Sequence, residues 1–171
     1  PSRQQCNQRG NLSFTSINLP RIAIKAKGDL EAFFEELDRK MDLCVDQLLE
    51  RFEIQARKKV YNFPFLMGQG VWLDSEKLGW TDEVREVLKH GTLSVGFIGL
   101  AETLVALTGK HHGESERSQR LGLEIIARMR SRMDAESQRT GLNFSLLATP
   151  AEGLSGCLTR LDKKKFGIIP G

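Results

Sequence analysis

Two long stretches of the chain repeat apolar residues at every third or fourth position. The first covers residues 30–52, and the second runs from about residue 114 to residue 139. This spacing is typical of amphipathic helices that bury one face. At 1.5 Å per residue, a first helix of about thirty residues would be roughly 45 Å long, which exceeds the diameter of a small domain. Helices of that length indicate a large partner, either a barrel or another subunit.

Three shorter stretches have the pattern of β-strands. Residues 12–24 are expected to form a strand whose side chains alternate between two faces until Pro20 interrupts the ladder. Residues 93–98 are a compact β-prone run between two glycines, and residues 143–148 form a similar run. Strands that alternate with long helices favour an α/β fold with a parallel sheet.

Shorter helices are expected between these elements. Residues 81–89 predict a helix capped by Thr81, and residues 100–107 predict one that ends at Gly109. Residues 62–70 contain a proline and two glycines and are expected to be irregular. The units 93–98 and 100–107 together form one strand-to-helix step.

Composition narrows the class of protein without identifying it. The 171 residues are 40% hydrophobic and 27% charged, with a net charge of +3, which is ordinary for a globular domain and too mild for nucleic-acid binding. The pattern predicts neither a membrane span nor a signal peptide. Three cysteines at irregular spacing fit a reducing compartment, which favours a cytoplasmic location.

The junction after the last predicted strand has the residues of an anion-binding turn. Thr149 is expected to be the N-cap of a helix, with Pro150 at its first position and Glu152 completing a capping box. The N–H groups of such a first turn can bind phosphate. The alternative is a plain capping box, and Glu152 would repel a phosphate if it pointed toward it.

Four segments in order resemble one enzyme family. They are Arg9-Gly-Asn-Leu-Ser-Phe-Thr-Ser-Ile-Asn-Leu-Pro-Arg, Gly91-Thr-Leu-Ser-Val-Gly-Phe-Ile-Gly-Leu-Ala-Glu, Thr108-Gly-Lys-His-His-Gly-Glu-Ser and Asn143-Phe-Ser-Leu-Leu-Ala-Thr-Pro-Ala-Glu-Gly-Leu-Ser-Gly. The chain resembles the anaerobic, class III ribonucleoside-triphosphate reductases, which are glycyl radical enzymes. The resemblance implies a partial ten-stranded β/α barrel with long helices. Residues 1–171 would be an internal fragment of a single catalytic barrel domain.

The resemblance also implies which residues meet the substrate. Asn11 would contact the ribose, although a turn residue leading into a strand is the alternative from sequence alone, and Asn18 is a weaker candidate for the same role. Cys157 stands where the family usually has an arginine that could help hold phosphate. The substrate phosphates would be held by Thr149, Ala151, Glu152, Gly153, Leu154, Ser155 and Gly156.

The remaining chemistry would lie outside this segment. The resemblance implies a glycyl radical and a zinc site nearer the carboxyl end of the parent, formate or a dithiol protein as reductant, a radical-SAM activating enzyme and a homodimer. The thiyl cysteine should precede Pro1, so Cys6 is not assigned that role. His111 and His112 are interpreted as residues of a solvated loop, and Glu102 as a residue in the first turn of a helix. No metal site is expected.

Two other functions stay open at this stage. One is a non-catalytic nucleotide-binding or dimerisation module derived from the same barrel. The other is a glycyl radical enzyme that acts on a small acid, which the 9–12 and 149–156 segments argue against.

Overall fold

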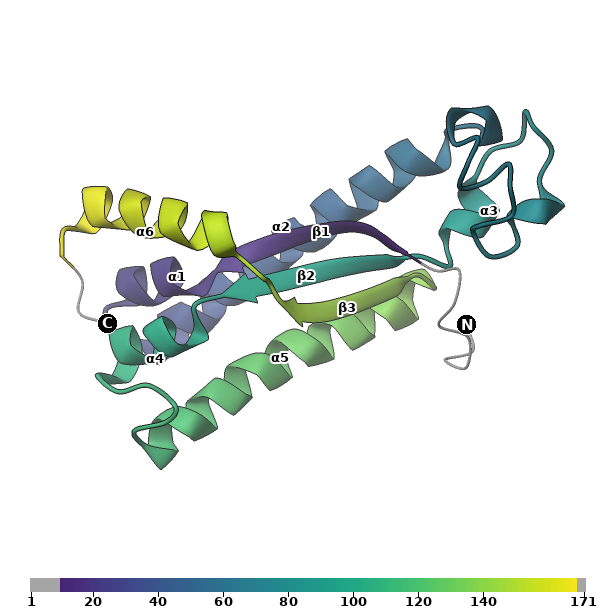
Figure 1. Cartoon of the computed structure of the whole chain (residues 1–171). Helices are drawn as coiled ribbons and strands as arrows, with labels where there is room; N and C mark the ends of the chain where they lie inside the picture. The colour runs from purple at the N-terminus through teal and green to yellow at the C-terminus, as the bar shows by residue number, and fades with distance from the viewer. Residues whose placement is uncertain (1–9, 169–171) are drawn as a thin grey trace.

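A three-stranded parallel sheet organises the chain in the computed structural model, which describes residues 10–168 (Figure 1). The strands are β1 (Asn11–Asn18), β2 (Thr92–Ile98) and β3 (Asn143–Ala148), with β2 in the centre. Both connections are crossovers that contain helices, as parallel pairing requires. The predicted α/β class with a parallel sheet is confirmed.

Two long helices cover one face of this sheet. Helix α2 (Leu30–Ala56) packs beneath β1 and β2, and α5 (Glu116–Thr140) packs beneath β3 (Figure 1). Each begins at a capping side chain: Asp29 accepts a hydrogen bond from the Ala32 N–H, and Ser115 accepts one from the Ser118 N–H. The sequence prediction of both helices is therefore confirmed.

The two faces of the sheet differ in character. The face toward the long helices is apolar, and its central residues Leu93 and Val95 are fully buried in the core that α2 and α5 complete. Because side chains alternate along a strand, Ser94 and Gly96 of β2 lie on the opposite face. Ser145 of β3 joins them there, since its hydroxyl hydrogen-bonds to that of Ser94. One face of the sheet is thus built for packing, and the other carries the small polar side chains of Ser94 and Ser145.

An irregularity at the start of β1 sets which face Asn11 occupies. Asn11 pairs with Thr92 and Ser13 pairs with Leu93, so one extra residue of β1 is accommodated between these pairs. In a regular strand, two residues that are three positions apart face opposite sides of the sheet. The bulge therefore allows Asn11 to share the polar face with Phe14, three residues later. The side-chain hydrogen bond from Ser94 to Asn11 confirms the placement.

The first strand is shorter than residues 12–24 predicted. It ends at Asn18, and residues 19–26 form helix α1 (Leu19–Ala26), so the strand prediction for 19–24 is wrong. Asn18 caps this helix, its amide oxygen accepting from the Arg21 N–H at 3.3 Å. Pro20 lies in the first turn, where a missing N–H costs nothing. The proline therefore starts a helix instead of merely ending a strand.

Helix α4 (Leu100–Thr108) follows β2 and ends at Gly109, as expected. The helix predicted over residues 81–89 is reduced to α3 (Arg85–Leu88) and is not capped by Thr81. Its first half is drawn into pairing instead, because the Val84 N–H donates to the carbonyl of Lys58 and the Val60 N–H to that of Asp82. The segment also contains two short 3-10 turns, η1 (Val60–Asn62) and η2 (Ser75–Lys77).

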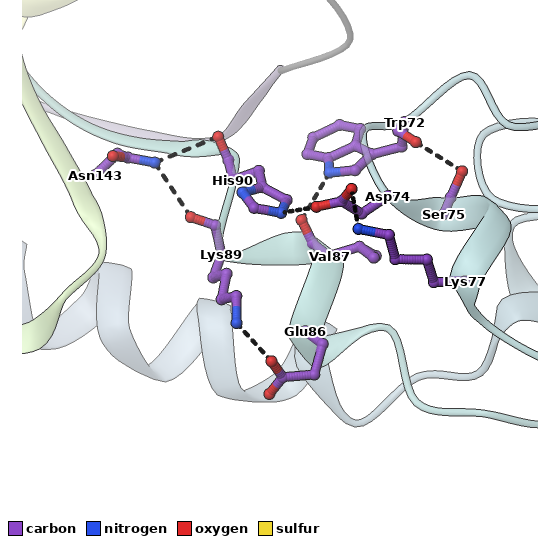
Figure 2. Close-up of polar contacts among 9 residues, drawn as sticks. All are labelled: Trp72, Asp74, Ser75, Lys77, Glu86, Val87, Lys89, His90 and Asn143. Atoms are coloured by element: carbon purple, nitrogen blue, oxygen red, sulfur yellow. Dashed lines mark hydrogen bonds and ion pairs between the residues drawn. The ribbon is translucent and has the colours of Figure 1, made fainter. Parts of the chain in front are cut away.

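Side-chain contacts tie this irregular segment to the amino-terminal end of the sheet. Figure 2 shows Asn143, the first residue of β3, donating to the carbonyls of Lys89 and His90 ahead of β2. The His90 ring hydrogen-bonds to Asp74 at 2.8 Å, and the Trp72 indole donates to the Val87 carbonyl. The irregular segment therefore covers the amino-terminal end of the sheet. It does not cover the carboxyl-terminal end.

Helix α6 (Glu152–Phe166) follows β3 and lies on the other side of the sheet from α5 (Figure 1). In the described part of the chain, no helix is both long enough and apolar enough to cross a bilayer.

Candidate functional site

The carboxyl ends of the three strands and the polar face beside them form the candidate site. Ligands of open parallel sheets bind at this end because the helices that follow the strands begin there. A cavity of about 320 Å³ lies at this rim. It is bounded by the start of α1, by α4 and by α6, with Asn18, Glu102 and Ser155 among its lining residues.

Thr149 lies on the polar face directly above Gly96. The Thr149 N–H donates to the carbonyl of Phe97, and its hydroxyl oxygen is 2.7 Å from that of Ser16 in β1. A Cβ at Gly96 would come within 2.0 Å of the Thr149 hydroxyl. The Thr149 side chain therefore reaches across β2 only because residue 96 has no side chain.

This contact overturns the predicted capping box. Helix α6 begins at Glu152 with Ala151 as its N-cap, and no side-chain hydrogen bond caps it. The tertiary partner Ser16 has taken the hydroxyl that a local capping box would use. Thr149 is thus an anchor for the turn and does not cap the helix.

The first turn of α6 has its N–H groups unused by the helix itself. The first helical hydrogen bond runs from the Ser155 N–H to the Ala151 carbonyl at 2.8 Å. The N–H groups of Glu152, Gly153 and Leu154 precede this bond. A Cβ at Gly153 would meet no atom within 4 Å, so the turn is open on that side. Backbone donors at an exposed helix start suit an anion.

Asn11 belongs to a row of hydrogen bonds that crosses all three strands. The buried Ser94 hydroxyl donates to the Asn11 amide oxygen at 3.2 Å and lies 2.9 Å from the Ser145 hydroxyl. A hydroxyl has one hydrogen, so Ser145 must donate to Ser94. The row thereby holds the Asn11 amide by its oxygen. Among residues 10–168, the amide NH₂ of Asn11 has no hydrogen-bond partner and is exposed for a ligand.

The two predicted parts of the site share one face and lie close together. The Asn11 side chain meets Ser94, and the Thr149 side chain covers Gly96, two residues further along β2. Two residues of a parallel strand span about 7 Å. A ligand with a polar ring at one end and an anionic tail at the other would fit such a spacing.

A buried carboxylate at this rim gave no signal in the sequence. Asp162 of α6 is 6% exposed, and its two oxygens accept from Arg21 Nε at 2.6 Å and from Asn18 Nδ2 at 3.0 Å. Asp162 sits among lysines in the sequence and looks like part of a solvated helix face. The Asn18 amide is occupied on both sides by these contacts, which favours Asn11 over Asn18 as the group that meets a ligand.

The other candidate side chains lie apart from this arrangement or contribute less. Cys157 is exposed on α6, whereas Cys44 is buried, and burial raises the pKa of the Cys44 thiol to about 11. His111 uses its ring nitrogen Nδ1 to accept from the Gly113 N–H. Within residues 10–168, no three metal-ligating side chains gather in one place. Cys6 lies outside the described residues.

The described residues form one α/β unit, with a three-stranded parallel sheet whose polar face carries the candidate site. Comparisons with known proteins identify the family. Residues 2–171 match the family model described as anaerobic ribonucleoside-triphosphate reductase. The chain belongs to this family.

Individual anaerobic ribonucleoside-triphosphate reductases are similar in sequence to nearly the whole chain. The chain is 39% identical to the anaerobic ribonucleoside-triphosphate reductase of Salmonella typhimurium over 95% of its length, and 37% identical to that of Escherichia coli. It is 32% identical to that of Enterobacteria phage T4. It covers 23% of the two bacterial relatives and 26% of the phage one. The expectation that the chain corresponds to part of a larger reductase agrees with that coverage.

Solved structures share the fold. An anaerobic ribonucleotide reductase superposes with a TM-score of 0.74 at 20% identity, covering 94% of this chain and 24% of that one. The Thermotoga maritima anaerobic ribonucleotide reductase in complex with dATP and CTP gives 0.69 over 94% of this chain and 25% of that one. The predicted partial barrel is confirmed by this likeness.

Proposed function

We propose that this chain forms part of the active-site wall of a ribonucleoside-triphosphate reductase that works anaerobically, within a single catalytic barrel domain. The parent enzyme reduces ribonucleoside triphosphates to 2′-deoxyribonucleoside triphosphates. In this proposal Asn11 holds the ribose, and the phosphate turn, defined as residues 149–156, holds the phosphates. The observation that carries it is that the side chains of Asn11 and Thr149 lie on one face and contact Ser94 and Gly96, which are two residues apart along β2.

The contributions of the two parts are chemically distinct. The Asn11 NH₂ donates to a ribose hydroxyl, and its own oxygen stays fixed by Ser94. In the phosphate turn, the N–H groups of Glu152, Gly153 and Leu154 face the anionic tail, together with the partial positive charge of the helix start. The Glu152 side chain is exposed and can turn to solvent, away from a bound phosphate.

The rest of the chemistry is assigned to parts of the parent beyond this chain. A glycyl radical, installed by a radical-SAM activating enzyme, would supply the unpaired electron that starts the reduction. Formate or a dithiol protein would be the reductant, and a zinc site would lie toward the carboxyl end. We further propose a homodimer in the cytoplasm. The family relationship supports these assignments, and the Thermotoga maritima structure in complex with dATP and CTP supports nucleotide ligands.

Two substitutions in the full-length protein test the proposal. Asn11→Ala removes the ribose donor, and Ser155→Asp places a carboxylate in the first turn of α6, where it should repel phosphate. We expect each variant to lower kcat/KM for CTP at least about tenfold. Asn11→Ala removes a polar contact to the ribose, and Ser155→Asp opposes the charge-assisted contact with the phosphates. Ser131→Asp on the exposed side of α5 is the matched control and should leave the rate unchanged. Normal CTP reduction by both site variants would refute the assignment.

A further inference from the structure

The attachment of α6 is unusual for a helix of its length. Of its 15 residues, only Asp162 is buried, and that residue carries a charge. The cavity of about 320 Å³ separates this helix from α1 and α4. An apolar core therefore does not hold α6 in place, and its position depends on polar contacts.

Those contacts converge on one strand. At the start of the phosphate turn, Thr149 bonds to Ser16, and further along the helix, Asp162 bonds to Asn18. Ser16 and Asn18 are two residues apart on the same face of β1. The ten steps from Glu152 to Asp162 extend about 15 Å along the helix axis. Two separated attachment points fix the direction of α6 as well as its position.

Asn18 and Arg21 give the second attachment its stability. Arg21 Nε donates to one oxygen of Asp162, and Asn18 Nδ2 donates to the other, so both carboxylate oxygens are satisfied. The Asn18 oxygen in turn caps α1 through the Arg21 N–H. A buried carboxylate is retained at low cost only when it is paired and hydrogen-bonded in this way.

From this arrangement we propose that Asp162 is a positioning residue for the phosphate turn, held by Asn18 and Arg21. Asp162 touches no substrate itself: it sets how the N–H groups at the start of α6 point across the polar face. The inference rests on the proposed function of that turn. Losing the attachment lets α6 swing about Thr149, so the triphosphate loses its aligned donors.

The test is CTP binding by the full-length protein, measured by isothermal titration calorimetry and by KM. Asp162→Asn leaves only one acceptor oxygen for two donors. Either the new NH₂ group faces the NH₂ group of Asn18, or it faces Arg21 Nε and that hydrogen bond is lost. We expect the CTP dissociation constant and KM to rise about tenfold, the scale of one hydrogen bond to a charged group. Arg21→Gln is the milder variant, because the Arg21 side chain is partly exposed, and it should weaken CTP binding about threefold.

A swap separates positioning from general loss of stability. Asn18→Asp with Asp162→Asn exchanges amide and carboxylate, keeps the net charge and leaves Arg21 beside a carboxylate. This double variant should bind CTP within about threefold of the parent. The matched control is Asp134→Asn, which breaks the exposed pair with Arg130 on α5 and should leave CTP binding unchanged.

The outcomes separate the two proposals. Weaker CTP binding by Asp162→Asn that the swap restores supports the positioning role. Unchanged binding in both Asp162→Asn and Arg21→Gln, or a loss that the swap does not restore, overturns it. If Ser155→Asp also binds CTP normally, the phosphate turn itself is misassigned. If only Ser155→Asp is impaired, the turn stands and the role of Asp162 fails.

Discussion

The hydroxyl oxygens of Ser16 and Thr149 lie 2.7 Å apart, although the two residues are 133 positions apart in the sequence and belong to opposite edges of the sheet. They meet because the central strand has a glycine between them. This contact joins the end of β3 to β1 and fixes the start of the phosphate turn.

The first prediction concerns that glycine. Gly96→Ala places a methyl group 2.0 Å from the Thr149 hydroxyl and 2.7 Å from that of Ser16, so the contact must break or the turn must move. We expect a loss of about 1–3 kcal/mol in unfolding free energy, as for overpacked sites, and weaker CTP binding. Calorimetry of the full-length protein measures both.

A second substitution checks the cause. Thr149→Ala in the Gly96→Ala background removes the nearest clash, so stability should recover in part relative to Gly96→Ala alone. If the double variant is less stable than the single one by the full cost of Thr149→Ala, the steric explanation is wrong.

The second prediction concerns Ser94, which orients Asn11. Ser94→Ala removes the donor to the Asn11 oxygen and lets the amide rotate. We expect kcat/KM for CTP to fall about threefold to tenfold, the value of one neutral hydrogen bond, with a smaller fall than for Asn11→Ala. Ser145→Ala, one step further along the row, should have a smaller effect than Ser94→Ala. Equal activity of Ser94→Ala and the parent would contradict the orienting role.

The third prediction concerns Cys157, which is exposed on α6 at the position where the family resemblance leads us to expect an arginine. Cys157→Arg should lower KM for CTP about threefold to tenfold, because a guanidinium binds phosphate through paired hydrogen bonds. Cys157→Ala serves as the control, with KM expected to match the parent. An arginine variant indistinguishable from the alanine variant would exclude a phosphate contact from this position.

The fourth prediction concerns the contact between α2 and α5. Arg128 donates to Asp38 with Nε 3.0 Å from Oδ1, and this hydrogen bond holds the pKa of Asp38 below its ordinary value of 3.8. A lowered pKa stabilises the fold above the ordinary value, and this contribution is lost as the pH falls through the lowered one. Asp38→Asn should therefore lower the melting temperature at pH 7.

The size and pH dependence of that effect make it testable. The pair is partly exposed, so we expect at most about 1 kcal/mol at pH 7 and a difference that shrinks below about pH 3.8. Calorimetry of both proteins across this range measures it, with Asp46→Asn on the exposed side of α2 as the control. A difference independent of pH would point to a cause other than the ion pair.

Periodicity predicted the elements that the core determines. The long helices and the strands β2 and β3 were predicted from their apolar spacing, because the same residues pack against one another in the fold. At Asn18-Leu-Pro the sequence contained a helix-start signal, an asparagine before a proline, that was interpreted as the end of a strand.

The candidate site shows where sequence reasoning stops. Thr149-Pro-Ala-Glu matches a capping box locally, but Ser16 is a partner from a distant strand and competes successfully for the hydroxyl. Asp162 had no local signal, since its burial depends on Asn18 and Arg21 across the fold. The family resemblance pointed to the phosphate turn, whereas only the structure shows how it is attached.

The bulge in β1 makes the spacing of this strand intolerant of length changes. Removing Leu12, the residue between Asn11 and Ser13, would restore regular pairing and leave Asn11 opposite Thr92 on the polar face, but it would also remove a side chain that packs against the core. Such a deletion would weaken the core while it kept Asn11 on its present face. A strand of the same length that paired regularly would instead turn Asn11 toward α2, so the irregular pairing decides which side of the sheet Asn11 faces.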